Sequence, residues 1–259
     1  MKIDFHSHVK ISKKSTFMPG YFEEMMKEAK ESGLDAIAMT EHFNTDRFYD
    51  VYEYLEKNHH YEHGYYLING LKLFPGIEVD VKEIGHILLI GDRTDIIEVR
   101  DFLEDHTDPE RFIPFKELLD LAEDYELLRI GAHAFRESTP LFQHDPNQLK
   151  RLDALDLNGK DLYTYGVAHY YKKLEMFADE LGLPIVAGSD THQFLQYGCV
   201  YNDVSGTCKT VNELKQHIKE GSYQIDISPC LDIKVKSAKL VKKLLKKMLN
   251  EDGVIVEKI

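Results

Sequence analysis

The sequence predicts a mixed α/β fold in which a mostly parallel sheet closes, or nearly closes, into a barrel. Short apolar strands alternate with amphipathic helical segments, the pattern of parallel strands joined by helical crossovers. About seven such strand–helix units follow one another along the chain. The chain has 259 residues, close to the ~250 residues of a typical single (β/α) barrel. No internal repeat, low-complexity segment or linker divides it in two.

The first strand spans residues 1–9 and alternates apolar with polar side chains. Ile3, Phe5 and Val9 alternate with Asp4, His6 and His8. Side chains two residues apart lie on the same face of a strand. We therefore expect Asp4, His6 and His8 to project together, with the two histidines near the carboxyl end of the strand, where they can begin a metal site.

The remaining elements follow in order from periodicity and from glycine and proline signals. The predicted segments are a helix over 19–33, a strand over 35–43, a helix over 46–60, a strand over 71–81 broken at Pro75-Gly76, a strand over 86–91, helices over 95–105 and 115–126, strands over 127–134 and 153–159, a helix over 165–181, a strand over 184–192, and a final helix and strand within 205–228.

The chain is predicted to divide into a barrel domain over 1–225 and a C-terminal extension over 226–259. The extension contains a basic amphipathic helix over 234–249. Its apolar positions form a stripe that is fit to pack on the barrel, with binding of RNA or lipid by its lysines as the alternative. The stripe consists of Ile233, Val235, Leu240, Leu244, Leu245 and Met248.

Composition limits the classes of partner. The formal net charge of −13 disfavours broad electrostatic binding to nucleic acid or to anionic membranes. The three cysteines form no CxxC pattern, which favours a reducing compartment. No segment resembles a signal peptide or approaches the ~20 apolar residues of a membrane span. We expect a soluble, cytoplasmic protein without a membrane partner; the sequence makes no prediction of its oligomeric state.

Histidines and acidic residues gather where the predicted strands end. Active sites of (β/α) barrels lie at the carboxyl ends of the strands. His86 instead opens its strand, but the short link over 81–86 permits an antiparallel hairpin that brings it to the same rim. The strand-end residues are His6, His8, His42, Glu78, His133, Asp190 and His192.

Imidazole and carboxylate ligands without thiolates suit Zn²⁺, Mn²⁺ or Fe²⁺. The candidates outnumber the four ligands of one tetrahedral ion, and a carboxylate such as Glu78 can bridge two ions. Two ions ~3.5–4 Å apart stabilise both oxygens of a phosphoryl displacement. We therefore expect two or three divalent ions.

Six motifs occur in a fixed order along residues 1–192: Ile-Asp-Phe-His6-Ser-His8, Met-Thr-Glu41-His42-Phe-Asn, Pro-Gly-Ile-Glu78-Val, Gly-His86-Ile-Leu-Leu-Ile-Gly, Ala-His133-Ala-Phe-Arg136 and Ala-Gly-Ser-Asp190-Thr-His192. The series resembles that of the PHP (polymerase and histidinol phosphatase) family. The resemblance implies a distorted (β/α)₇ barrel and a phosphoesterase site with two or three metal ions.

The resemblance also implies a ligand set for each ion. His6, His8, Glu78 and Asp190 would hold the first, and Glu78 would bridge to a second held by His86 and His133. His42 and His192 would hold a third with an acid or histidine from the loop after the first strand. That loop, 9–17, contains none, and Glu41 stands where the family usually has aspartate. Glu41 is therefore a candidate substitute for the missing ligand.

Three further side chains are candidates for supporting roles. Arg136 and Lys160 are candidates to bind a substrate phosphate, with a surface salt bridge or a solvated lysine as the alternatives. Asp4 could orient a ligand imidazole, unless it binds backbone amides instead.

We expect a hydrolase of phosphoric esters that acts on a small phosphomonoester with a metal-bound hydroxide as nucleophile. Arg136 would hold a phosphate oxygen, and His192 or His42 would protonate the leaving oxygen. One alternative is a nuclease acting on short nucleic-acid ends, so that nucleic acid would enter only as substrate. The other is a non-catalytic metal-binding regulatory module.

Overall fold

The computed structural model describes residues 1–252, with side chains through residue 248. The strands are β1 (Lys2–Ser7), β2 (Ala36–His42), β3 (His60–Glu62), β4 (Tyr65–Ile68), β5 (Leu71–Asp80), β6 (His86–Ile90), β7 (Leu128–Ala132), β8 (Ala154–Asn158), β9 (Ile185–Gly188), β10 (Val200–Val204) and β11 (Tyr223–Ile227). The α-helices are α1 (Pro19–Glu31), α2 (Tyr49–Asn58), α3 (Arg93–Phe102), α4 (Phe115–Glu123), α5 (Pro146–Leu149), α6 (Gly159–Tyr165), α7 (Val167–Leu181), α8 (Val211–Glu220) and α9 (Leu231–Asp252).

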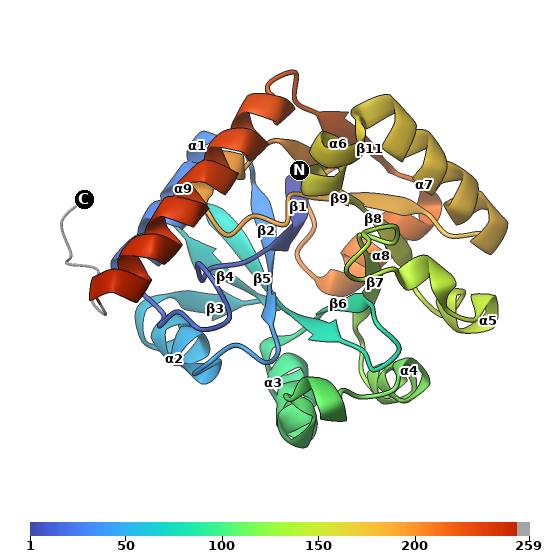
Figure 1. Cartoon of the computed structure of the whole chain (residues 1–259), viewed down its shortest axis with the longest axis horizontal. Helices are drawn as coiled ribbons and strands as arrows, with labels where there is room; N and C mark the ends of the chain where they lie inside the picture. Colours follow the sequence, from blue (N-terminus) through green and yellow to red (C-terminus); the bar gives the residue numbers. More distant parts are fainter. Residues whose placement is uncertain (253–259) are drawn as a thin grey trace.

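The sheet curves into a nearly closed barrel surrounded by helices (Figure 1). Its path runs β1-β2-β5-β6-β7-β8-β9, and β10 and β11 continue it beyond β1. A parallel bridge between Ser7 and Thr191 joins the end of β1 to the segment after β9. The predicted distorted, TIM-like α/β barrel is therefore confirmed.

Strand β6 is the source of the distortion. It pairs antiparallel with both β5 and β7, whereas the β1–β2, β2–β5, β7–β8 and β8–β9 pairs are parallel. The register places His86, the first residue of β6, opposite Asp80 at the end of β5. The expected hairpin thus brings His86 to the rim at which the parallel strands end.

The predicted break at Pro75-Gly76 is wrong, because β5 continues through both residues. Pro75 keeps its place opposite Met39 of β2, and its carbonyl accepts a hydrogen bond from Gly91. At Gly76, a Cβ atom would lie 3.0 Å from the Leu89 carbonyl oxygen and 3.1 Å from that of Met39. Glycine here permits close approach of the two flanking strands rather than a turn.

Three strands were absent from the sequence prediction. Two of them, β3 and β4, form a hairpin that extends the sheet beside β5. The third is β10, which lies antiparallel to both β1 and β11. Its residues 200, 202 and 204 are buried while 201 and 203 are less so, which is the alternation of a half-buried strand.

Two hydrophobic clusters hold the barrel together. One packs helical residues such as Phe22, Val51 and Leu174 against the sheet. The other joins strand residues across the barrel, including Phe5 and Ile130. The barrel is thus filled by side chains, and the polar side chains that remain buried are concentrated where the strands end.

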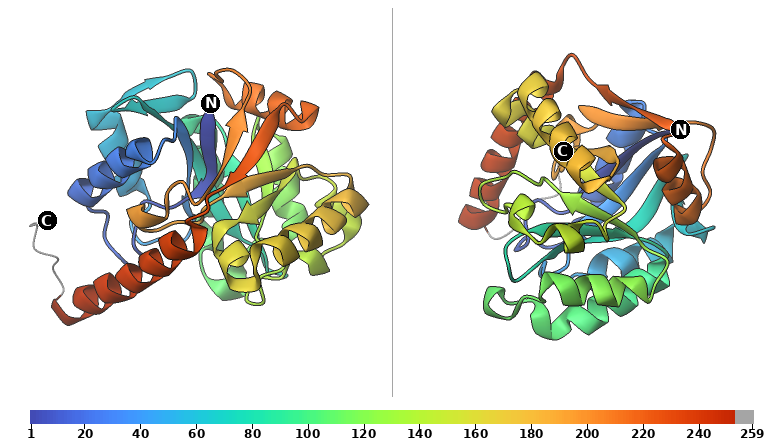
Figure 2. Two further views of the ribbon diagram at one scale, coloured as in Figure 1. Left: turned by 90° about the horizontal axis from the view of Figure 1, so that it is seen from above. Right: turned by 90° about the vertical axis from the view of Figure 1, so that its right-hand side faces the viewer.

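Helix α9 contacts α6 and the short 3-10 helix Phe194–Gln196, two segments that follow β8 and β9. It lies at the end of the molecule toward which β1 runs from the N terminus (Figure 2, left). Leu231, Val235 and Ala238 are buried. Only part of the expected apolar stripe packs on the barrel, since four of its residues are more than half exposed. These are Ile233, Leu240, Leu244 and Met248.

The last residues of the predicted extension, 253–259, lie outside the described part of the chain. Within the described part, none of the helices combines the length and the apolar character needed to cross a bilayer.

Candidate metal centre

All eight predicted metal ligands converge at the rim where the parallel strands end. Their nitrogen and oxygen atoms form three groups, in each of which the ligand atoms lie within 4.8 Å of one another. The first group is His6, His8 and Asp190, the second is Glu78, His86 and His133, and the third is His8, His42 and His192. His8 belongs to the first and third groups, and Glu78 of the second group lies 3.4 Å from His8 and 2.8 Å from His42, so the three groups form one continuous cluster.

Glu78 lies at the middle of this cluster. Oε1 is 2.7 Å from Nδ1 of His86 and 3.3 Å from Nε2 of His133. Oε2 is 2.8 Å from Nδ1 of His42 and 3.4 Å from Nε2 of His8. Because the two oxygens face different histidines, the carboxylate has the geometry of a bridging ligand.

The first group is compact and fully buried. Nε2 of His8 lies 3.3 Å from Nε2 of His6 and 3.4 Å from Oδ1 of Asp190. Backbone hydrogen bonds fix this geometry, because Asp190 donates to the His6 carbonyl and His8 donates to the Thr191 carbonyl. Strand β1 and the loop after β9 are therefore joined at the point where the three ligands meet.

The imidazoles of the third group form a compact triangle. The ring centroid of His8 lies 4.4 Å from that of His42 and 4.0 Å from that of His192, and the last two are 5.7 Å apart. Nδ1 of His8 and Nδ1 of His192 are buried and have no hydrogen-bond partner among the described residues. Buried polar atoms are rarely left unpaired in folded proteins, so these nitrogens fit metal coordination.

Two ligand candidates adopt strained backbone conformations. His133 has φ +32° and Asp190 has φ +53°. Non-glycine residues seldom adopt positive φ, and such strain clusters at functional sites. His133 directly follows β7, and Asp190 is the second residue after β9. The unusual backbone conformation at each position turns the side chain into the cluster.

Burial keeps several imidazoles neutral. It lowers the pKa of His42 to about 4, against the attraction of Glu78. It also lowers the pKa of His192 well below the usual value, and the neighbouring His8 adds to this. His133 shifts in the same direction through burial and the nearby Arg136. A neutral imidazole offers the lone pair that a metal ion requires.

The carboxylates are held ionised. Burial alone would raise the pKa of Glu78, but the surrounding imidazoles, His86 foremost among them, outweigh burial and keep that pKa well below the ordinary range. For Asp190, Lys160 and Arg136 likewise outweigh burial. Ionised carboxylates together with imidazole nitrogens are the donor set of hard and borderline divalent ions.

His86, like His6, has a carboxylate facing each of its ring nitrogens. Its Nδ1 lies 2.7 Å from Glu78 and its Nε2 lies 2.9 Å from Asp80. Although burial lowers its pKa, the attraction of these carboxylates raises it to about 9. Coordination through His86 would therefore displace a proton.

Several residues that orient the ligands were not predicted from the sequence. Asp156 of β8 contacts Nδ1 of His6 at 2.9 Å, and the Thr139 hydroxyl lies 3.1 Å from Nδ1 of His133. Carboxylates and hydroxyls in these places fix the tautomer and orientation of ligand imidazoles. The sequence held one signal for the role of Asp156: the segment Asp-Leu-Asn forms the carboxyl end of the parallel strand β8.

The expectation that Asp4 orients an imidazole is wrong. Its Oδ1 accepts hydrogen bonds from the backbone N–H groups of His6 and Ser189. The pairing of β1 with β2 shifts register between Asp4 and Ser7, so the strict alternation assumed from the sequence does not hold there. The alternative, a buried acid that binds backbone amides, describes the structure.

Glu41 is turned toward the backbone of the loop after β1. Its Oε2 accepts from the N–H groups of Val9 and Lys10, and its Oε1 accepts from that of His42. Burial raises its pKa, but the contacts with His8 and His42 lower it to about 2. Glu41 belongs to none of the three ligand groups; instead His8 completes the group of His42 and His192.

Arg136 and Lys160 both contact Asp190. Nη1 of Arg136 lies 2.9 Å from Oδ2, and Nζ of Lys160 lies 2.7 Å from Oδ1. The guanidinium also donates to Asp161 and Asn158. Both side chains therefore position a candidate ligand at the edge of the cluster.

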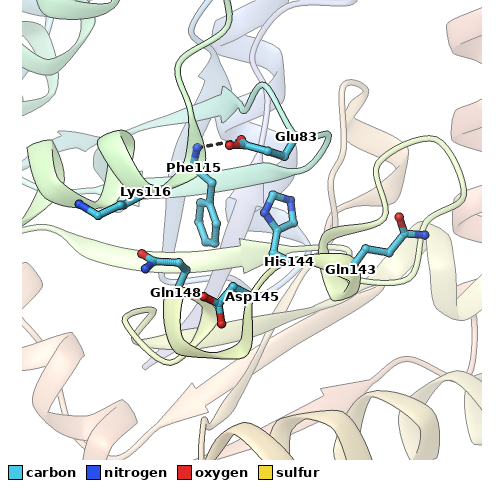
Figure 3. Close-up of a pocket in the computed structure, with 7 residues that line it drawn as sticks. All are labelled: Glu83, Phe115, Lys116, Gln143, His144, Asp145 and Gln148. Atoms are coloured by element: carbon cyan, nitrogen blue, oxygen red, sulfur yellow. Dashed lines mark hydrogen bonds between the residues drawn. The ribbon is translucent and has the colours of Figure 1, made fainter.

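A concave region of about 350 Å³ lies beside α4 and α5 (Figure 3). Two of its polar side chains bond to the backbone: Glu83 accepts from the N–H of Phe115, and His144 lies 2.9 Å from the carbonyl oxygen of Ile84. None of the predicted site residues lines it; the lining residues are Glu83, Phe115, Lys116, Gln143, His144, Asp145 and Gln148.

The barrel and its rim of histidines and carboxylates define a metal-dependent hydrolase. The model of the PHP domain matches residues 4–228. This chain belongs to the PHP-domain family of metal-dependent phosphoesterases, and it is an enzyme of the class that hydrolyses phosphoric esters.

Solved structures share this fold. PsfC from Pseudomonas syringae PB-5123 superposes with a TM-score of 0.78 at 21% identity, over 94% of this chain and 98% of that one. The lesion-specific endonuclease PfuEndoQ from Pyrococcus furiosus superposes with a TM-score of 0.62 at 22% identity, over 86% of this chain and 57% of the endonuclease. The present chain thus spans little more than half of the endonuclease. Among curated proteins, none matches this chain by sequence.

Proposed function

We propose that this enzyme hydrolyses a small phosphomonoester at a centre of two or three divalent ions. The observation that carries the proposal is the position of Glu78, whose two oxygens face five histidines from neighbouring strands. Those histidines are His6, His8, His42, His86 and His133.

The ligand groups define the proposed sites. His6, His8, Asp190 and Glu78 would hold one ion, and Glu78 would bridge to a second ion held by His86 and His133. His42 and His192 would hold a third, completed by the second ring nitrogen of His8. Zn²⁺, Mn²⁺ and Fe²⁺ suit these ligands. Such ions supply Lewis-acid activation of water and neutralise charge on a phosphoryl group.

The chain's own side chains position these groups and the substrate. Asp156 orients His6, and Arg136 contacts Oδ2 of Asp190, whereas His6 and His8 face its Oδ1. Arg136 and Lys160 also place cationic N–H groups at the edge of the cluster, where a phosphate oxygen would accept them. Burial lowers the pKa of both His42 and His192, which favours a ligand role over proton donation for both residues.

A nuclease acting on short nucleic-acid ends is the second candidate. The fold of PfuEndoQ supports it, since a related structure shows Endonuclease Q in complex with a 27-mer duplex that carries an abasic lesion. The net charge of −13 opposes extended contact with a polyanion. The superposition covers 57% of the endonuclease chain, so almost half of that protein has no counterpart here.

The test is a substrate panel with Mn²⁺ or Zn²⁺. Sugar phosphates and nucleoside monophosphates are compared with single-stranded and duplex oligonucleotides. We expect turnover of small phosphomonoesters, lost in His6→Ala and retained in His60→Ala, a change at an exposed histidine of β3. Turnover of oligonucleotides alone would overturn the small-substrate proposal in favour of the nuclease.

A non-catalytic regulatory module is tested by the same panel together with elemental analysis. This alternative predicts bound metal without turnover of any substrate. The proposed enzyme contains two or three metals per chain, and the count falls in His6→Ala but not in His60→Ala.

A further inference from the structure

We propose that Lys13, in the loop after β1, positions the metal ligand His86 by holding Asp80. The loop over 9–17 would then act on the second ion, although it contains no acid or histidine. This inference rests on the proposed function, in which His86 holds the second ion together with Glu78 and His133. Lys13 and Asp80 are positioning residues, because they act on the ion through His86.

Asp80, the last residue of β5, faces His86 across the β5–β6 hairpin. The register pairs the two residues, and Oδ1 of Asp80 lies 2.9 Å from Nε2 of His86. On the other side of the ring, Nδ1 lies 2.7 Å from Oε1 of Glu78. With Nε2 bonded to Asp80, Nδ1 is the nitrogen that His86 presents to an ion. His6 presents the opposite nitrogen, because Asp156 contacts its Nδ1.

The second oxygen of Asp80 is held by Lys13. Nζ of Lys13 lies 2.8 Å from Oδ2. The Asp80 side chain is only 14% exposed, so water screens this ion pair less than it screens a surface pair. Asp80 belongs to none of the three ligand groups, and the ammonium group on Oδ2 would repel a metal ion there. The two contacts therefore fix the carboxylate with one oxygen toward the imidazole.

The backbone of Lys13 is itself fixed. Its carbonyl accepts hydrogen bonds from the N–H of Asp46, at 2.7 Å, and from the hydroxyl of Thr45, at 3.0 Å. Both donors follow β2, and Ile11 of the same loop is fully buried. Lys13 thus reaches from a fixed point of the loop to the end of β5. The next residue, Lys14, is exposed.

A simple charge effect of Lys13 would have the opposite sign to a positioning effect. A cation near metal ions repels them, so removing its charge would by itself strengthen metal binding. If Lys13 instead holds Asp80, its removal frees the carboxylate to turn away from Nε2 of His86, and metal binding weakens. The direction of the change in metal affinity therefore separates the two effects.

The test is titration of the metal-free full chain with Co²⁺ in competition with a chromogenic chelator, together with the visible absorption spectrum of the bound Co²⁺. Asp80→Asn should weaken the binding of one Co²⁺ per chain about 10–100-fold, the usual effect of losing an orienting carboxylate. Lys13→Met should weaken it about tenfold, at the low end of that range. Both changes should alter the absorption bands of that ion.

Two single variants serve as controls. Lys13→Arg can still pair with Asp80 and should keep the affinity and the spectrum close to those of the unmodified protein. Lys14→Met removes the same charge from the exposed neighbouring position and should change neither. Urea denaturation in the presence of a metal chelator checks that each variant is folded.

The double variant of Lys13→Met and Asp80→Asn should bind Co²⁺ no more weakly than Asp80→Asn alone, because Lys13 acts through Asp80. Unchanged or tighter binding in Lys13→Met, an equal loss in Lys14→Met, or a further loss in the double variant would overturn the proposal. Failure of the proposed function looks different: no small phosphomonoester would be hydrolysed, while the dependence of Co²⁺ affinity on Lys13 would persist.

Discussion

Oδ2 of Asp156 lies 2.9 Å from Nδ1 of His6, and both side chains are completely or almost completely buried. The contact leaves Nε2 of His6 facing His8 and Glu78. Asp156 therefore selects the ring nitrogen that His6 presents to the metal centre.

Asp156→Asn should weaken metal binding by about 10–100-fold, the usual effect of removing an orienting carboxylate. The amide keeps the size of the side chain but loses the charge that supports the His6 tautomer. Competition with a chromogenic chelator measures the affinity. Asp226→Asn, at an exposed position of β11, should leave it unchanged, and an unchanged affinity in the Asp156 variant would refute the orienting role.

The sequence could predict that these residues converge, because each lies at or near the end of a strand or begins an antiparallel one. Barrel topology then brings residues that are far apart in the chain, such as His6 and Asp190, to one rim. The orienting partners were harder to predict, since the contact of Asp156 with His6 depends on how far β8 is shifted along the barrel. The shifted register at Asp4 likewise has no signature in the alternating pattern of β1.

The strands and helices were also predictable from the sequence, except where the surroundings in the fold override the preference of a residue or of a pattern. Pro75 looks like a strand breaker, yet β5 continues because glycine at position 76 allows its neighbours to approach closely. The helix α9 follows an amphipathic pattern, yet Leu240 and Leu244 are exposed. Periodicity gave the helix but not the face that contacts the barrel.

Glu41→Gln tests whether Glu41 is a metal ligand or a support for the loop after β1. Both carboxylate oxygens accept from backbone N–H groups, and the NH₂ group of glutamine would face at least one donor. We expect a loss of about 2 kcal/mol in the free energy of unfolding, measured by urea denaturation. The number of metals per chain should not change.

Glu53→Gln, at an exposed position of α2, provides the control and should keep both stability and metal content. Loss of one metal per chain in Glu41→Gln without loss of stability would instead assign Glu41 to the third ion.

The cysteines should differ sharply in reactivity. Cys199 and Cys208 are completely buried, and burial raises the pKa of both thiols. Cys230 is exposed. Because the thiolate is the reactive form, an aromatic disulfide reagent should modify one thiol in the native protein and three in denaturant. Cys230→Ser should leave none reactive in the native state; rapid labelling of that variant would contradict the buried positions.

Asp4 should make the protein less stable as the pH rises from about 4 to 7. Burial raises the pKa of its carboxyl from 3.8 to about 6, although hydrogen bonds from Ser189 and His6 oppose the shift. The folded state therefore retains a proton that the unfolded state loses at lower pH. The stabilisation is complete below the unfolded pKa and is lost as the pH rises through the folded pKa.

Asp4→Asn removes this titration while Oδ1 can still accept from the two backbone N–H groups. The amide nitrogen of the asparagine would replace Oδ2 of Asp4, which is buried without a hydrogen bond. The missing partner lowers the variant's free energy of unfolding by the same amount at every pH. Relative to the unmodified protein, the variant should therefore gain about 3 kcal/mol between pH 4 and pH 7. Urea denaturation with a metal chelator measures the difference at each pH. A difference that stays flat with pH would mean that the carboxyl is ionised in the folded state, held by its two N–H donors despite its burial.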